Sequence, residues 1–340
     1  MFTANWKQKL TVLLTVFIMG ITMAGCSSSP ALETTPQPKD QTTSSKDTDT
    51  SPTQQPFSES TRIVLTQFDG SQVVLEEVTQ SICAHSYALA LILHDLGLNI
   101  TSIMSTSRPL PQALEALPTI GTPQNPDYEL IKSYDTDLLM SSSTFKESTE
   151  KFLKEQGIAA CYLDITLYSD TRRNIEILGK AFSKTTEMER LLKDIDQREQ
   201  AVLNQIGDQQ GKTIAIIMGT GKSFLFNTEK SYVGEMAAMM GLENIVKSSE
   251  KGESTVAFST EQLVQLDPDI ILRYAHGSNW EEVNASFESI FSENNAFSNL
   301  KDVKNGNVYD LDAELFTANA GTRSIESFET LAKTLFGREE

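Results

Sequence analysis

Apolar residues along the chain follow two spacings, which predict alternating strands and helices. Short apolar runs predict strands at 100–104, 138–140 and 159–163, whereas wider spacing predicts helices at 86–96, 126–132 and 144–156. Before them, 62–65 and 72–75 predict a hairpin that turns at Asp69-Gly70. This alternation is typical of an α/β fold with a mostly parallel sheet covered by helices.

A longer helical pattern begins near Glu187 and ends near Gly207. Its apolar residues recur at helical spacing with charges between them, which predicts one long amphipathic helix. After Gly211 the alternation restarts, with strands at 213–218, 270–272 and 308–311 and helices at 232–240, 280–291 and 324–336. We therefore predict two β/α lobes joined by a single long helix, with a ligand cleft between the lobes. The predicted boundaries are 61–185 for the first lobe, 186–210 for the linking helix and 211–340 for the second lobe.

The first residues have the pattern of an export signal. Lys7 and Lys9 precede an apolar run at 10–24, and small residues then lead to Cys26. The run is short for a membrane span and suits a signal peptide over 1–25. Its end resembles the bacterial lipobox, which implies cleavage before Cys26 and attachment of a lipid such as palmitate to its thiol. The alternative is an uncleaved anchor helix in which the cysteine is incidental.

Residues 26–60 are mainly Ser, Thr, Pro, Gln, Lys and Asp. Such a segment buries too little apolar surface to offset its ordering entropy, so we expect a disordered tether. The alternative is a glycosylated or partner-binding tail.

Charge and cysteine usage exclude several classes of protein. Removing residues 1–25, with two lysines and no acids, changes the formal net charge from −18 to −20. This acidity argues against nucleic-acid binding and favours a neutral or cationic ligand, or a partner with basic surfaces. Cys83 and Cys161 could form a disulfide, but we expect two buried free thiols, Cys83 beside a helix start. The spacing of cysteines and histidines supports no structural zinc site, and no catalytic motif is evident, so we predict a protein that is not an enzyme.

The predicted architecture, together with the lipobox, resembles the helix-linked class of ABC-transporter substrate-binding proteins. These carry siderophores, cobalamin, haem or some metals. The stretch at 266–272 (LDPDIIL) is typical of the class. Four further stretches resemble the IsdE-like haem-receptor lipoproteins: 120–127 (IGTPQNPD), 218–223 (MGTGKS), 272–277 (LRYAHG) and 303–311 (VKNGNVYDL).

The resemblance implies that His276 is an axial ligand of haem iron. The residues around it agree, because His276 follows a predicted buried strand, where open α/β sheets bind ligands. Gly277 lets the backbone approach a flat macrocycle, and a neutral imidazole suits haem iron. The alternative is a loop histidine held for structure.

The first lobe departs from the family at Gln124, where haem-binding relatives have a methionine. Either Gln124 only hydrogen-bonds the ligand, or another first-lobe residue coordinates iron, or the ligand is a different tetrapyrrole or chelate. His85 is the leading replacement because it starts a helix expected to face the cleft, although a structural role is equally open. Tyr87 and Tyr128 are weaker candidates, and His94 is expected at a solvated helix end.

The stretch at 218–223 lacks the spacing of a phosphate loop. We interpret it as a cleft loop in which the backbone and Ser223 receive a carboxylate such as a haem propionate, with Lys222 or Arg273 adding positive charge. The alternative for Lys222 and Arg273 is a solvated surface residue.

The resemblance implies a receptor on the extracellular face of the bacterial cytoplasmic membrane, held there by its lipid anchor. It would take haem, including haem from upstream surface donors, and deliver it to an ABC permease and its ATPase for iron transport. Glu235 matches an acidic position that docks on the permease, whereas Leu91 stands where relatives often have Glu, so Asp95 or Glu129 is the expected substitute. Two alternatives stay open: binding of a ferric siderophore or cobalamin on the same scaffold, and a surface enzyme or adhesin.

Overall fold

The computed structural model describes residues 62–76, 79, 81–209, 211–221, 223–277, 280–293 and 300–337. All of them belong to one compact unit, Phe57–Glu340. The predictions for the signal peptide, Cys26, the tether at 26–60 and Lys222 lie outside the described residues.

The first lobe is built on a four-stranded parallel sheet in the order β4-β3-β7-β8. Its strands are β3 (Ile82–Ala84), β4 (Ile100–Ile103), β7 (Leu138–Ser142) and β8 (Ala159–Leu163). Its helices are α1 (Tyr87–Asp95), α2 (Gln112–Glu115), α3 (Tyr128–Ser133), α4 (Lys146–Glu155) and α5 (Ser169–Ala181). The predicted hairpin is confirmed as β1 (Ile63–Thr66) paired with β2 (Gln72–Leu75).

A second, very short hairpin lies in the first lobe between β4 and α3. It consists of β5 (Gly121–Thr122) and β6 (Asn125–Pro126), so Pro123 and Gln124 form its turn. Gly121 has φ 87°, and a Cβ atom there would lie 2.6 Å from the carbonyl oxygen of Asn125. Only glycine fits this position, which fixes the turn that carries Gln124.

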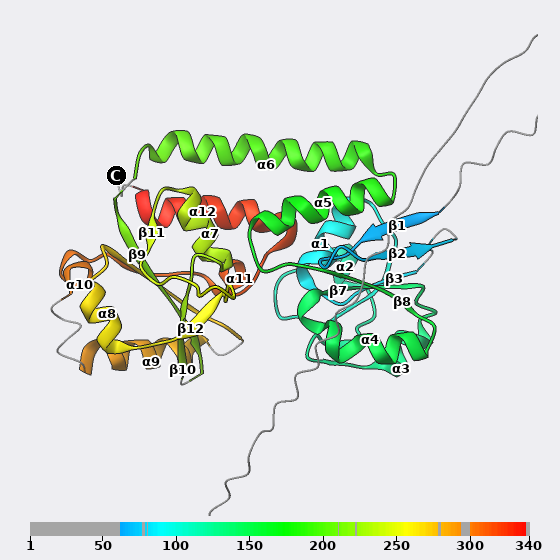
Figure 1. The fold of residues 1–340 in the computed structure, drawn as a ribbon, viewed down its shortest axis with the longest axis horizontal. Helices are drawn as coiled ribbons and strands as arrows, with labels where there is room; N and C mark the ends of the chain where they lie inside the picture. Colours follow the sequence, from blue (N-terminus) through cyan, green and yellow to red (C-terminus); the bar gives the residue numbers. More distant parts are fainter. Residues whose placement is uncertain are drawn as a thin grey trace, which may run out of the picture. The chain divides into compact units, whose positions relative to one another are not determined.

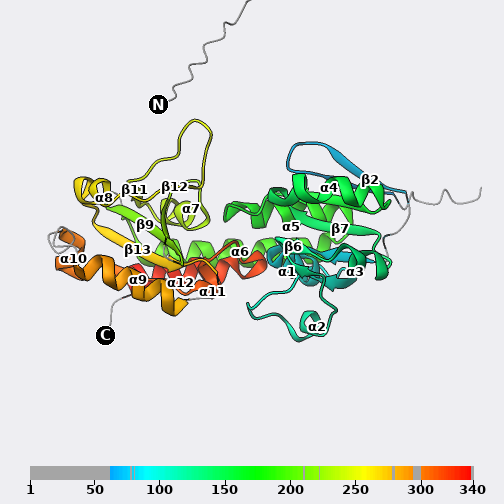
Figure 2. The same cartoon turned by 90° about the horizontal axis from the view of Figure 1, so that it is seen from below.

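The linking helix is α6 (Thr185–Ile206), which runs alongside both lobes (Figures 1 and 2). Its apolar stripe, which includes Met188, Ile195 and Val202, belongs to the main core. The last helix, α12 (Ser324–Phe336), packs against α6, and Arg198 joins them through two hydrogen bonds to Glu329 of 2.8 and 2.6 Å.

The second lobe has a mixed sheet in the order β12-β10-β9-β13-β14, with β11 also paired to β9. Its strands are β9 (Thr213–Thr220), β10 (Ser223–Asn227), β11 (Glu243–Asn244), β12 (Thr255–Ala257), β13 (Ile270–Ala275) and β14 (Val308–Asp310). Its helices are α7 (Tyr232–Met239), α8 (Thr260–Leu266), α9 (Trp280–Glu293), α10 (Lys301–Asn305) and α11 (Ala313–Phe316). The β9, β13 and β14 strands are parallel, whereas β10 is antiparallel to its neighbours.

The stretch predicted as a cleft loop at 218–223 lies largely in strands. Residues 218–220 end β9 and Ser223 begins β10, with Thr220 opposite Ser223. Gly219 serves packing, because a Cβ atom there would lie 2.3 Å from Val283 of α9. Gly219 therefore lets a helix approach the sheet, whereas a Cβ atom at Gly221 would meet nothing within 4 Å.

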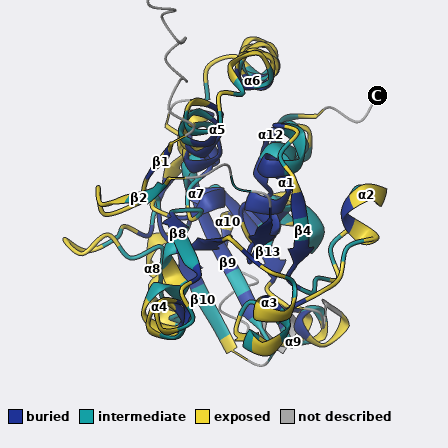
Figure 3. Ribbon diagram, turned by 90° about the vertical axis from the view of Figure 1, so that its right-hand side faces the viewer, coloured by how far each residue is buried: buried dark blue, intermediate teal, exposed yellow. Residues whose placement is uncertain are grey.

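One apolar core extends through both lobes, from Leu65 and Leu89 to Ile216 and Phe328. The other face of each sheet has its own smaller cluster, under α3 and α4 in the first lobe and under α8 and α9 in the second. Figure 3 shows the strands buried at the centre and the outward faces of the helices exposed.

The two described cysteines are free and buried. Cys83 lies in β3, not beside a helix start as expected, and belongs to the cluster under α3 and α4. Cys161 lies in β8 and belongs to the main core on the other face of the sheet. Because successive strand residues point to opposite faces, this arrangement keeps the two thiols apart.

Within the described ranges, no helix combines the length and the apolar character that a membrane crossing needs.

Candidate ligand-binding site

A cavity of about 420 Å³ lies between the lobes, lined by side chains of both. A second cavity of about 560 Å³ adjoins it and shares Tyr87, Arg108, Pro123 and Gln124. We call them the inner and outer cavity. Together they have a size that suits a small ligand or cofactor.

The two lobes contribute similar helix starts to the inner cavity. Ser86 caps α1 by accepting from the backbone N–H of Leu89, and Ser231 caps α7 by accepting from that of Gly234. The following residues, Tyr87 and Tyr232, also line the cavity. The N-terminal end of a helix carries partial positive charge, so both starts favour an anionic group nearby.

His276 is exposed and lines the inner cavity. It follows β13, and its backbone N–H donates to the carbonyl of Gly219 at 2.8 Å. Its Nδ1 lies 3.1 Å from the carbonyl oxygen of Thr317. Because a carbonyl can only accept, Nδ1 carries a proton, and in the neutral form of the ring Nε2 then has the lone pair. This is the tautomer that a metal-binding histidine needs.

His85 also lines the inner cavity but is completely buried. Its Nδ1 lies 2.8 Å from the hydroxyl of Ser141, and its ring packs edge-on against Phe145. Burial lowers the pKa of His85 to about 4, and the nearby backbone of Pro123 opposes this shift only in part. The imidazole is therefore neutral at neutral pH, and its Nε2 has no aligned hydrogen-bond partner among the described residues.

Gln124 and Tyr87, both predicted to lie in the cleft, line both cavities. Gln124 is exposed at the turn between β5 and β6. Tyr87 donates through its hydroxyl to the carbonyl of Pro109 at 2.9 Å, which makes it part of the wall. A thioether that the sequence analysis did not consider, Met218, lines the inner cavity from the second lobe, beside Tyr274 in the sheet.

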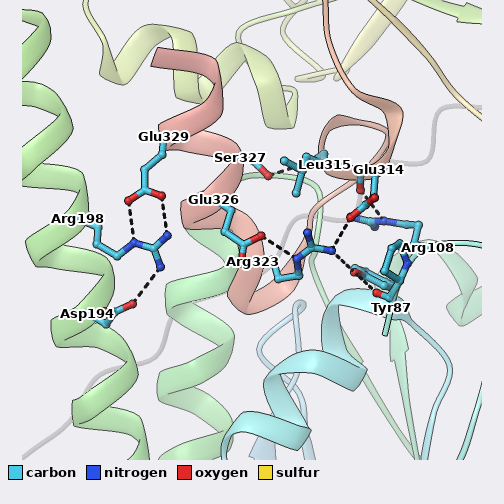
Figure 4. A network of polar contacts seen from close by, with 11 residues as sticks. Tyr87, Arg108, Asp194, Arg198, Glu314, Leu315, Arg323, Glu326, Ser327 and Glu329 are labelled. Atoms are coloured by element: carbon cyan, nitrogen blue, oxygen red, sulfur yellow. Dashed lines mark hydrogen bonds and ion pairs between the residues drawn. The ribbon is translucent and has the colours of Figure 1, made fainter. Parts of the chain in front are cut away.

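Arg108 is the cationic residue that sequence reasoning missed. Its guanidinium lies over the ring of Tyr87, 3.7 Å from the centroid (Figure 4). Its Nε donates to the carbonyl of Glu314 at 2.9 Å and its Nη1 to that of Asn319 at 3.3 Å, so it connects the lobes. Burial lowers its pKa, but an arginine stays charged. Its Nη2 is buried without a partner among the described residues.

Charge in the inner cavity is positive although the chain is acidic. Arg108 is the one permanently charged side chain that lines it in the described part of the chain, and no carboxylate does so. Glu314 borders only the outer cavity, where it pairs with Arg323 at 2.9 Å. The inner cavity therefore suits a ligand with anionic oxygen atoms.

Arg273 does not supply charge to the cavity. It is 6% exposed and lies among Asp310, Glu288 and the ring of Phe287, with hydrogen bonds of 2.8 and 2.7 Å to Asp310. Its neighbour Tyr274 lines the cavity instead. The reason is the two-residue period of a strand, which turns Arg273 toward α9 and Tyr274 toward the ligand.

Two other predicted residues lie away from both cavities. Tyr128 packs against Phe152 and donates to the carbonyl of Ser148, between α3 and α4. Ser223 is exposed at the start of β10. His94, at the end of α1, pairs with Asp95 at 2.8 Å.

Glu235 connects the lobes. Its carboxylate accepts from the backbone N–H of Ser169 at 2.9 Å and from the Ser169 hydroxyl at 2.7 Å. Ser169 is the first residue of α5, which has no side-chain cap of its own. Glu235 thus satisfies a helix start in the other lobe.

No cluster of three or more His, Cys, Asp or Glu side chains suited to a metal ion occurs among the described residues.

Two lobes, a long connecting helix and a cavity between the lobes define a substrate-binding protein. The periplasmic binding protein family model matches residues 82–315. The chain belongs to this family. The high-affinity heme uptake system protein IsdE of Staphylococcus aureus is 31% identical over 235 residues, which cover 68% of this chain and 80% of that protein.

Solved structures agree with the fold. An ABC transporter substrate-binding protein from Listeria monocytogenes superposes with a TM-score of 0.69 at 30% identity, covering 76% of this chain and 99% of its own. Staphylococcus aureus IsdE complexed with heme superposes with a TM-score of 0.68 at 28% identity, covering 75% of this chain and 98% of its own. Staphylococcus aureus SirA complexed with staphyloferrin B shares the fold. It superposes with a TM-score of 0.67 at 18% identity, covering 80% of this chain and 98% of its own. The predicted fold class and the resemblance to IsdE-like substrate-binding proteins are thus confirmed.

Proposed function

We propose that this protein is a membrane-anchored haem receptor that delivers haem to an ABC permease for iron acquisition. The observation that carries the proposal is His276, an exposed histidine at the cavity whose Nδ1 donates to Thr317, so that in the neutral ring Nε2 has the lone pair. A neutral imidazole nitrogen is a common ligand of haem iron. The likeness to IsdE supports haem over other ligands.

The remaining lining supports a ligand with carboxylates. Haem is flat and apolar with two propionate groups, and the inner cavity combines the aromatic walls Tyr87, Phe145 and Phe316 with Arg108 and two helix starts. Arg108 replaces Arg273, Lys222 and Ser223 as the proposed propionate partner, because its Nη2 is buried and has no hydrogen-bond partner among the described residues.

His85 is the proposed second axial ligand, from the first lobe. Its neutral ring suits iron, and its Nδ1 is held by Ser141, whose own hydroxyl donates to the carbonyl of Ser142 at 3.4 Å. Coordination through Nε2 requires the tautomer in which Nδ1 donates to the Ser141 oxygen, and it displaces the contact of the ring with the Pro123 backbone. Since His85 is fully buried, coordination requires the neighbouring turn at Pro123 and Gln124 to shift.

The rest of the proposal concerns delivery. Lipid attachment at Cys26 would hold the protein at the extracellular face of the membrane, where it receives haem from upstream surface donors. Docking on the permease and its ATPase then passes the haem inward, with Glu235 among the contact residues.

Titration of the apo-protein, residues 61–340, with hemin tests the function. We expect a saturable Soret shift that ends at one hemin per protein. The controls are hemin in buffer alone and hemin with a protein of another fold. Absence of a shift beyond that of the unrelated protein would exclude haem as the ligand.

A ferric siderophore is the second candidate. It is favoured by the donors at the cavity that have no partner within the described part of the chain, since these also suit an oxygen-rich chelate. Quenching of Trp280 fluorescence by a ferric carboxylate siderophore or by cobalamin, with no Soret change on adding hemin, would support a ligand of this kind. Turnover of a substrate without stoichiometric binding would instead indicate a surface enzyme.

A further inference from the structure

Asn227 is held rigidly in the wall of the inner cavity. It is the last residue of β10, it is 3% exposed, and it lines the cavity. Its side-chain Oδ1 accepts from the hydroxyl of Tyr274 at 3.0 Å. Its backbone carbonyl accepts from the side chain of Asn244 at 3.0 Å. The bond to Asn244 therefore holds the backbone of Asn227, and the bond from Tyr274 holds its side-chain oxygen.

The side-chain nitrogen of Asn227, Nδ2, differs from the oxygen in its contacts. Nδ2 is buried and has no hydrogen-bond partner among the described residues. Buried donors are almost always paired, because an unpaired one loses its hydration without compensation. Since Tyr274 already occupies the oxygen, the amide offers only a donor to whatever enters the cavity.

We propose that Nδ2 of Asn227 donates to a carboxylate oxygen of the ligand. This inference rests on the proposed function, and it assigns a neutral donor in the second lobe in addition to the cationic Arg108 of the first lobe. The two residues line one cavity from different lobes. Haem carries two carboxylates, so a ligand of this class can satisfy both donors.

Two substitutions at one position separate donation from packing. Asn227→Leu keeps the branched shape, at a larger volume, and removes the donor together with the oxygen that accepts from Tyr274. Asn227→Asp keeps the size and shape and replaces the donor with a negative charge that faces the ligand carboxylate. The probes are hemin and hemin dimethyl ester, in which both carboxylates are esterified. Asn204→Leu, at an exposed residue of α6, is the control. Thermal unfolding of each apo-variant verifies folding.

We expect Asn227→Leu to weaken hemin binding about tenfold and Asn227→Asp to weaken it more, because two carboxylates repel. Both variants should bind the dimethyl ester as the wild type does, and Asn204→Leu should change neither. If both variants bind hemin with wild-type affinity, or lose hemin and ester equally, the inference is wrong while the proposed function stands. If the wild type binds neither probe, the proposed function fails and the inference falls with it.

Discussion

His276 and Thr317 brace each other at the rim of the inner cavity. The His276 Nδ1–H donates to the Thr317 carbonyl at 3.1 Å, and the Thr317 hydroxyl donates to the carbonyl of Ala275 at 2.9 Å. The two bonds hold the loop after β13 against the segment after α11. They fix both the position of the imidazole and its tautomer, which leaves Nε2 for a ligand.

Replacing His276 should therefore weaken haem binding far more than replacing His94. Losing an iron ligand should cost on the order of 2–4 kcal/mol, by analogy with the loss of a buried charged or hydrogen-bonded contact. His94 lies at the end of α1 and lines neither cavity. Hemin titrations of His276→Ala and His94→Ala measure the difference, and equal losses would refute the assignment of His276.

Hemin should bind in two kinetic phases, because His276 is exposed and His85 is enclosed. A fast phase should give a high-spin spectrum with His276 as ligand. A slower phase, in which the turn at Pro123 and Gln124 shifts, should give a low-spin bis-histidine spectrum. Stopped-flow absorption with His85→Ala should show the first phase alone.

Gln124 supplies the control for this prediction. In the His85→Ala background, Gln124→Met places a thioether at the exposed turn and should restore a low-spin spectrum. A wild-type spectrum that stays high-spin and does not respond to His85→Ala would show that His85 is not a ligand.

Replacing Arg108 with Gln should weaken binding of hemin by about tenfold and of its dimethyl ester much less, since a charge-assisted hydrogen bond contributes about 1.5–3 kcal/mol at most. Arg108→Lys should recover part of the loss, because lysine keeps the charge without the planar fork. A glutamine variant with wild-type affinity for hemin would place the carboxylates elsewhere.

Charge reversal of Glu235 should reduce haem uptake in cells while leaving the hemin spectrum of the purified protein intact. The variant Glu235→Lys removes both the proposed docking charge and the cap on α5. Ser169→Ala is the matched control, since it removes one of the two bonds and keeps the carboxylate. If Ser169→Ala lowers uptake as much as Glu235→Lys does, the residue acts by joining the lobes and not by docking.

Asp269 should contribute stability that is lost in acid. Its carboxylate accepts from the backbone and hydroxyl of Thr213, both at 2.8 Å, and pairs with Lys301 at 3.0 Å. Its pKa is lowered to about 2, first by the backbone bond to Thr213. The unfolded chain takes up the proton at a higher pH than the native state, so this stability is present above pH 4 and disappears as the pH falls toward 2.

Because the carboxylate is partly exposed, we expect Asp269→Asn to cost only about 1 kcal/mol near neutral pH. Urea unfolding at neutral pH and at about pH 2 measures this. A difference between wild type and variant that persists undiminished in acid would contradict the prediction.

The sequence by itself determined the order of elements, the long helix and the position of His276. These features are local: apolar spacing sets each strand and helix, and His276 follows a buried strand directly. The family pattern also singled out Gln124, which lines both cavities. Because successive residues of a strand point to opposite faces, the sequence already places Arg273 and Tyr274 on different faces of the second sheet. Which of these faces lines the cavity depends on where the first lobe packs.

Only the tertiary structure decided the chemistry of the cavity. Arg108 bonds to Glu314, which is 206 positions away, so no local pattern identifies it as a cleft residue. Burial of His85 likewise results from packing of Pro123 and Phe145 around a helix start that looks open in the sequence. Asn227 looks like an ordinary strand end in the sequence. Only the packing of Tyr274 and Asn244 fixes its amide so that Nδ2 has no partner among the residues that the structure describes. Spacing along the chain determines which side chains lie on the same side of a helix or strand. Which groups then come into contact depends on how distant segments pack.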